Sequence, residues 1–279
     1  RKVRTENLDL LHVHFPLSPL FASCPVMVTV HDMVPFSHNL FDFGIRFRLW
    51  RWLCSYFLYP WSIRKAKWIV CVSDATRQAL RELFPETFHK SIVVHSGVGE
   101  DFRAPIEPAT AELVHTRLKL PYNYLLYSGS LRQDKNVQGL LKAYALLHQQ
   151  NPQFEEYHLV MEVLGHDFNP APIEKMIHQY GLDGHVKIIR DIGDEERCVL
   201  FRDARVLVIL SRQEGFGFPI MQAQLTGLPI IAAEAGALPE VAGEGAILVN
   251  PDNLENIAAM MKNVLEDQEL QAYLRDKGR

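Results

Sequence analysis

Hydrophobic residues in the second part of the chain form short continuous runs, which alternate with stretches whose apolar positions recur at helical spacing. Strands are predicted at residues 124–127, 158–164, 186–190, 206–210, 229–233 and 246–249. Helices are predicted at residues 136–150, 172–180, 194–202, 219–226 and 254–277, the last broken near Asp267. Strands without polar alternation that are separated by helices indicate a parallel sheet covered on both faces.

The first part of the chain begins in the middle of a similar pattern. Strands are predicted at residues 10–14, 26–31, 68–72 and 91–95, and one or two aromatic-rich helices at 42–63. A complete doubly wound domain starts with a strand and a glycine-rich turn, an opening that this sequence lacks. We therefore expect the first domain to be incomplete. We also expect the chain, which begins with Arg1, to be a piece of a longer protein or one processed at both ends.

Charge and proline content change between the two parts. Residues 1–104 hold 13 Lys and Arg against 9 Asp and Glu, whereas residues 105–279 hold 16 against 24. Pro105 and Pro108 lie at this change, and prolines so close together suit a linker. The sequence thus predicts two α/β domains, 1–104 and 105–279.

The composition excludes several classes of protein. With 279 residues, 48% of them hydrophobic and 22% charged, the chain has an ordinary globular composition. Its net charge of −4 weighs against nucleic-acid binding. Its four cysteines lack Cys-x-x-Cys spacing, which argues against a zinc ribbon and favours a reducing compartment. We therefore expect a cytoplasmic protein, with Cys71, Cys198 and His95 in its core.

A glycine-containing segment at residues 211–219 follows a predicted buried strand and precedes a predicted helix. Parallel sheets bind ligands at this position. Gly215 and Gly217 allow a close approach of the backbone to a ligand, helix amides near Phe218 can bind an anion, and Glu214 can accept hydrogen bonds from hydroxyl groups. The alternative is a tight turn that needs glycine for its shape alone.

A second polar cluster, residues 127–136, also lies between a predicted strand and a predicted helix. Lys135 in this cluster can pair with a phosphate as a point charge. The alternative is a solvated lysine at the start of a helix.

Together the two clusters resemble the retaining nucleotide-sugar glycosyltransferases of family 4, which have the two-domain fold called GT-B. Tyr127-Ser-Gly-Ser-Leu with Lys135-Asn136 is similar to that family's phosphate-contacting segment. Glu214-Gly-Phe-Gly-Phe-Pro is similar to the start of its Glu-x7-Glu motif, and Leu238-Pro-Glu-Val-Ala-Gly243 to a following loop. His31-Asp32 and residues 72–74 and 93–97 match further family segments, and all occur in the family's order. The resemblance implies two Rossmann-like domains with parallel sheets. Compared with the family, the sequence lacks the initial strands of the first domain and the final helix that usually packs back on that domain.

The resemblance also implies a reaction and its residues. A hexose would pass, with retention, from a GDP- or UDP-sugar such as GDP-mannose to a glycan or lipid-linked acceptor in polysaccharide biosynthesis. Glu214, His31 and Asp32 would be the catalytic residues at the donor sugar. The donor nucleotide would be bound by Gly129, Ser130, Arg132, Lys135, Gly215, Phe216, Gly217, Phe218 and Gln222. The sequence has no Asp-x-Asp motif, so we expect no metal and no cofactor besides the donor, because cationic residues and helix amides can stabilise the departing diphosphate.

The sequence departs from the family in ways that leave a second interpretation open. Gln222 stands where the family has the second glutamate that grips the ribose, a loss of about 1 kcal/mol of hydrogen bonding. Ser130 stands where the family often has arginine, with Arg132 close enough to substitute. The missing start would expose a sheet edge, which a missing segment or a partner chain would complete. The alternative function is a catalytically degenerate fragment that binds nucleotide or serves in assembly.

Two further features carry less specific predictions. Residues 43–67 combine basic and aromatic side chains, a pattern that suits contact with the inner face of a membrane or, alternatively, a core helix with a solvated basic face. His12 and His14 lie on one face of a predicted strand, but without a third ligand nearby a metal site is not expected. A nicotinamide dehydrogenase is disfavoured because no Gly-x-Gly-x-x-Gly follows a predicted strand.

Overall fold

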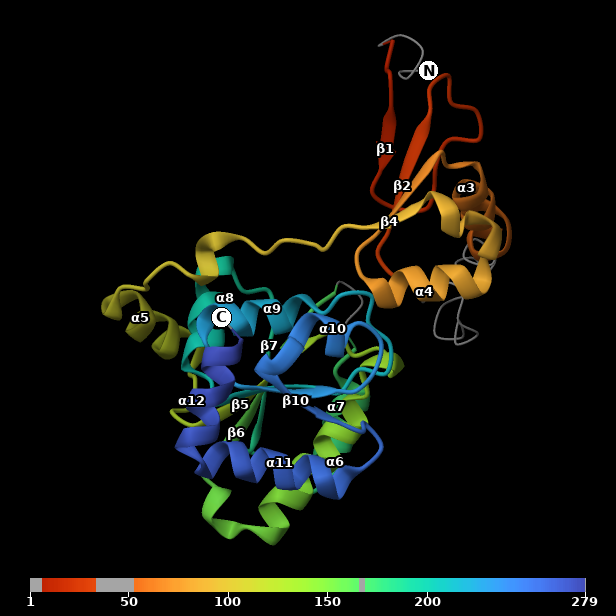
Figure 1. Ribbon diagram of the computed structural model, residues 1–279. Coiled ribbons are helices and arrows are strands. Elements are labelled where there is room, and N and C mark those ends of the chain that lie inside the picture. The colour runs from red at the N-terminus through yellow and green to blue at the C-terminus, as the bar shows by residue number, and fades with distance from the viewer. Residues whose placement is uncertain (1–6, 34–52, 166–168, 279) are drawn as a thin grey trace. The chain divides into compact units, whose positions relative to one another are not determined.

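A computed structural model describes residues 7–33, 53–165 and 169–278 (Figure 1). The chain forms two compact units, Arg1–Gly97 with Glu214–Phe216, and Val98–Gln213 with Gly217–Arg279. Among the described residues, no helix combines the length and the apolar character that a membrane crossing requires.

The second unit contains a six-stranded, all-parallel sheet in the order β10-β9-β8-β5-β6-β7. Its strands are β5 (Tyr124–Gly129), β6 (His158–Val163), β7 (Val186–Ile189), β8 (Val206–Ile209), β9 (Ile230–Ala233) and β10 (Ala246–Val249). All residues of β8 and β9 are buried, as expected for a sheet covered on both faces. Figure 1 shows α6 and α11 on one side of this sheet and α8 and α9 on the other.

The helices of the second unit largely follow the predicted spacing. They are α5 (Pro108–Leu118), α6 (Val137–Gln150), α7 (Ala171–Gln179), α8 (Asp194–Asp203), α9 (Phe218–Thr226), α10 (Leu238–Ala242), α11 (Leu254–Glu266) and α12 (Gln268–Lys277). Short 3-10 turns lie at Glu100–Phe102, Gln133–Lys135, Pro152–Phe154 and Gly243–Gly245. The break predicted near Asp267 is confirmed, because the Asp267 side chain accepts a hydrogen bond from the Leu270 amide and begins α12.

The first unit contains a four-stranded parallel sheet in the order β1-β2-β3-β4. The strands are β1 (Leu11–Val13), β2 (Val26–Val30), β3 (Trp68–Cys71) and β4 (Ser91–Val93). Helical segments are the π-helical turn Cys54–Leu58, α3 (Tyr59–Lys65), α4 (Asp74–Leu83) and the 3-10 segment Pro85–Lys90. Its core is formed by Val28, Val30, Ile63, Ala66, Ile69, Cys71, Leu80 and Phe84. Residues 42–52 of the predicted aromatic helix lie outside the described residues.

The α/β fold class with two parallel sheets is confirmed. Cys71 and Cys198 are buried as predicted, but the prediction for His95 is wrong, because it is exposed. It follows β4, an edge strand of its sheet that already ends at Val93. The rings of His12 and His14 lie against each other, tilted by 43° with centroids 4.4 Å apart, and His12 Nε2 is hydrogen-bonded to the Thr29 hydroxyl at 2.8 Å.

Candidate active site

The two polar clusters lie at the carboxyl ends of neighbouring strands in the second unit. β5 pairs in parallel with β8 through Leu125–Val206 and Leu126–Leu207. Beyond these strands, the main-chain N–H of Arg212 donates a hydrogen bond to the carbonyl oxygen of Asp134, with the two atoms 2.8 Å apart. The fold therefore joins the cluster after β5 to the start of the segment after β8.

A third loop, which follows β10, is tied to the same place. Asn136 directly precedes α6 in the left-handed conformation with a φ of 53°, and its side-chain amide donates to the carbonyl oxygen of Pro251 at 3.0 Å. Arg212 forms an ion pair with Asp252. The sequence did not single out Pro251 or Asp252, because only the sheet order brings the loop after β10 close to the other two.

The two cations of the first cluster share one carboxylate. Arg132 binds Asp134 with both nitrogens, Nε to Oδ1 at 2.8 Å and Nη2 to Oδ2 at 3.0 Å. Lys135 Nζ lies 3.6 Å from the same Oδ2, and its side chain is only 15% exposed. These three side chains therefore bring two positive charges and one negative charge together. Asp134 was not among the predicted site residues, although an acidic residue between two cations was a visible signal.

The backbone of the first cluster is held against a buried tyrosine. The Tyr127 hydroxyl donates to the carbonyl oxygen of Ser130 at 2.6 Å. A Cβ atom at Gly129 would lie 2.8 Å from the Tyr127 hydroxyl oxygen, so a larger residue there would displace the Tyr127 ring. Main-chain atoms of Gly129 and Ser130 are therefore presented in a fixed geometry.

In sequence, the segment after β8 leads directly into α9, whose first turn provides main-chain amides. Gly217 precedes α9 with a φ of 96°, and a Cβ atom there would lie 3.0 Å from Leu238 Cδ2. The first amides of a helix have no intrahelical acceptor and can bind an anion, and Phe218 begins α9. Gln222 lies one turn further along α9 and is half-buried.

The remaining predicted site residues belong to the first unit. His31 and Asp32 directly follow β2, and Glu214–Phe216 group with this unit. Within it, the Ser73 hydroxyl donates to the carbonyl oxygen of Gly215 at 2.6 Å. A Cβ atom at Gly215 would collide with the carbonyl oxygen of His31. Only glycine fits at that position.

Comparison with known families follows the same division of the chain. The model of the family "Glycosyl transferases group 1" matches residues 111–279, and that of "Glycosyltransferase Family 4" matches residues 1–102. The chain belongs to the group 1 glycosyltransferases, and the resemblance inferred from its motifs is confirmed.

Curated relatives and solved structures agree with this assignment. O-antigen chain mannosyltransferase B of Escherichia coli is 27% identical over 207 residues, which cover 74% of this chain and 53% of that protein. O-antigen chain mannosyltransferase RfbU of Salmonella typhimurium is 24% identical over 85% of this chain and 60% of that protein. The chain thus spans between half and two thirds of these relatives' length. The Anabaena protein HepE, solved in complex with UDP-glucose, has a TM-score of 0.78 at 19% identity, covering 99% of this chain and 74% of HepE.

Proposed function

We propose that this chain carries the donor site of a retaining glycosyltransferase that moves a hexose from a nucleoside diphosphate sugar to a glycan or lipid-linked acceptor. The observation that carries the proposal is the hydrogen bond from the Arg212 amide to the Asp134 carbonyl oxygen, at 2.8 Å. It joins the two segments that resemble the family's donor-binding motifs, at the sheet edge where parallel sheets bind ligands.

The second unit supplies the groups that a departing diphosphate needs. Negative charge grows on the diphosphate as its bond to the sugar breaks, and fixed positive groups stabilise this charge most effectively. Arg132 and Lys135 are held by Asp134, the amides of Ser130 and of the start of α9 are the neutral donors we assign to the phosphates, and Gly129 lets the backbone approach them closely. Gln222 would accept a hydrogen bond from a ribose hydroxyl. This set of charges supports transfer without a metal.

We assign the reacting sugar to residues of the first unit. Glu214 would accept a hydrogen bond from a sugar hydroxyl and hold the sugar near the reacting carbon, and His31 would contact the same sugar with Asp32 beside it. Gly215 and Phe216 would contribute main-chain atoms. These roles follow the family resemblance, and the close packing of Gly215 on the His31 carbonyl supports them.

The curated relatives favour mannose as the sugar, since two of them are named O-antigen chain mannosyltransferases. We therefore infer GDP-mannose as the first donor to test, with UDP-sugars second. A lipid-linked acceptor would place the reaction at the inner face of a membrane. In the described part of 43–67, exposed Arg64, Lys65 and Lys67 support such a contact.

The test is calorimetric titration of this chain with GDP, UDP, GDP-mannose and UDP-glucose, followed by a transfer assay on the longest natural form of the protein. We expect one nucleotide to bind, and Glu214→Ala to abolish transfer while nucleotide binding remains. Unchanged turnover in Glu214→Ala would refute the role of that residue. Binding without any transfer by the natural protein would instead favour the degenerate nucleotide-binding module.

A further inference from the structure

A carboxylate that has no assigned role so far is buried at the end of β6. Glu162 is the fifth residue of this strand and is 0% exposed, between the buried apolar residues Met161 and Val163. Burial of an unpaired carboxylate destabilises a protein by several kcal/mol, so such a group persists only with well-placed partners. The partners of Glu162 therefore indicate what it does.

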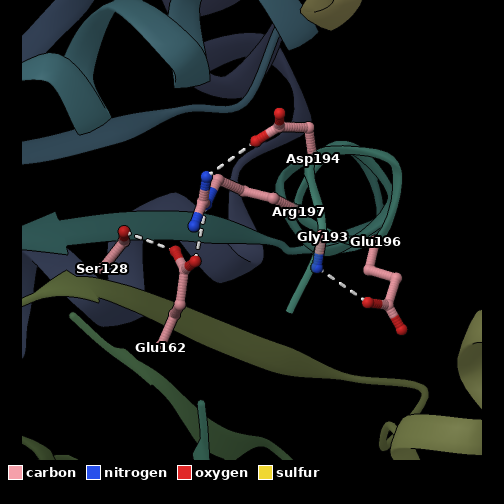
Figure 2. Close-up of polar contacts among 6 residues, drawn as sticks. All are labelled: Ser128, Glu162, Gly193, Asp194, Glu196 and Arg197. Carbon is pink, nitrogen blue, oxygen red and sulfur yellow. Dashed lines mark hydrogen bonds and ion pairs between the residues drawn. The ribbon is translucent and has the colours of Figure 1, made fainter. Parts of the chain in front are cut away.

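Figure 2 shows that each carboxylate oxygen of Glu162 has its own donor. The Ser128 hydroxyl donates to Oε2 at 2.6 Å, and Arg197 Nε donates to Oε1 at 2.6 Å. Ser128 and Glu162 are paired residues of neighbouring strands β5 and β6. Arg197 comes from α8, where its Nη1 also contacts Asp194 Oδ1 at 3.1 Å. One carboxylate thus links β5, β6 and α8.

This link lies directly before the segment assigned to the donor phosphates. Ser128 is followed by Gly129 and Ser130, and residues on either side of Ser128 in a strand point to the opposite face of the sheet. On that opposite face the Tyr127 hydroxyl holds the Ser130 carbonyl at 2.6 Å. Glu162 therefore holds the side chain of Ser128 on one face of the sheet, and Tyr127 holds the Ser130 carbonyl on the other face. Together they fix the backbone of residues 128–130.

We propose that Glu162 is a positioning residue for donor binding, with Arg197 as its counter-ion. This inference rests on the proposed function, because it assumes that residues 129–135 hold the diphosphate. The carboxylate fixes the Ser128 hydroxyl, and the loop is ordered before the nucleotide arrives, which lowers the entropy lost on binding. Arg197 balances the charge of Glu162, so that the buried carboxylate does not oppose an incoming anion.

A purely stabilising ion pair would behave differently. Replacing both members of a buried ion pair by apolar residues of similar size often leaves stability unchanged or raises it. The double variant Glu162→Met with Arg197→Met should therefore lose little more stability than the buried Ser128 hydroxyl gained from its bond to Glu162. If Glu162 positions the loop, this variant still binds GDP about tenfold more weakly, because the Ser128 hydroxyl has lost its acceptor, a change of about 1.4 kcal/mol.

The decisive experiment combines two measurements on the wild type, Ser128→Ala, the double variant and Asp194→Asn. The first is hydrogen exchange of the amides of residues 129–136 in nucleotide-free protein. The second is calorimetric titration with the nucleotide that the wild type binds. We expect Ser128→Ala and the double variant to speed exchange at these amides severalfold, with exchange in β8 and β9 unchanged, and to raise the Kd about tenfold. Asp194→Asn removes only the negative charge at the outer contact of Arg197 and should match the wild type.

The two proposals fail separately in this design. If the wild type binds no nucleotide, the donor-site assignment fails, while hydrogen exchange still tests whether Glu162 orders the loop. If exchange at residues 129–136 is unchanged in Ser128→Ala and in the double variant, the positioning role is overturned even where nucleotide binds. A double variant whose Kd equals that of the wild type would likewise show that the ion pair only stabilises the fold.

Discussion

Replacing Lys135 by alanine should weaken nucleotide binding strongly while leaving the fold intact. The ammonium group of Lys135 lies 3.6 Å from Asp134 Oδ2, at the end of the short 3-10 turn Gln133–Lys135. Its removal takes away one of the two positive charges beside Asp134, so the summed charge of the three side chains falls from +1 to zero. A diphosphate would then meet no excess positive charge from these three side chains.

The size of the effect follows from the contact that is lost. A hydrogen bond to a charged group contributes about 1.5–3 kcal/mol, which corresponds to a rise in Kd of roughly 10- to 100-fold. Part of the effect is long-range attraction, which salt screens with a Debye length of about 8 Å at physiological ionic strength. The ratio of mutant to wild-type Kd should therefore shrink as salt is raised.

Calorimetric titration with GDP at two salt concentrations measures both effects. Lys175→Ala is a matched control, because Lys175 is an exposed lysine on α7. We expect that variant to bind like the wild type. A Lys135→Ala protein that melts normally and binds GDP as tightly as the wild type would refute the assignment of Lys135 to the diphosphate.

Three other expectations follow from the structure. Gly217→Ala and Gly181→Ala both place a side chain at positive φ, 96° and 68°, and each should lower the free energy of unfolding by about 1–2 kcal/mol. Only Gly217→Ala should also weaken GDP binding. Equal GDP binding by the two variants would contradict the role of the α9 N-terminus. Burial, and next the neighbouring His185, lower the pKa of His148, so the folded state binds its proton less readily than the unfolded state. The contribution of His148 to the free energy of unfolding is therefore fully present above about pH 6.5 and is lost as the pH falls below that value. Urea unfolding should show that His148→Gln loses less free energy of unfolding between pH 7.5 and 5.5 than the wild type does. An identical loss in the two proteins would refute this cause. Transfer by the natural protein should persist in excess EDTA, whereas activity restored only by added Mg²⁺ or Mn²⁺ would show that a metal takes part.

The strands of the second unit were predictable because a sheet covered on both faces requires continuous apolar runs. Helices α4 and α5 were not predicted, because the residues at which they begin also suit other structures. Pro108 indicated a linker, yet it begins α5, since proline fits the first turn of a helix. α4 begins at Asp74 after Ser73, whose hydroxyl accepts from the Thr76 amide at 3.0 Å, a cap that becomes evident only beside a recognised helix.

The candidate site was predictable as separate motifs but not as an arrangement. Spacing identified Lys135 and the glycine segment, because the family motifs are contiguous in sequence. The partners of Glu162 are not, since Arg197 lies 35 positions away along the chain. A single glutamate within the apolar run 158–164 signalled a buried charge, but only the register of β5 and β6 pairs it with Ser128.

We propose that the loops after β5 and β8 bind the diphosphate of a nucleotide sugar. A crystal structure of this protein soaked with GDP tests it most directly. We expect the diphosphate within hydrogen-bond distance of Lys135 and of main-chain amides at Ser130 or the start of α9. GDP bound elsewhere on the protein, with Arg132 and Lys135 facing only solvent and Asp134, would contradict it.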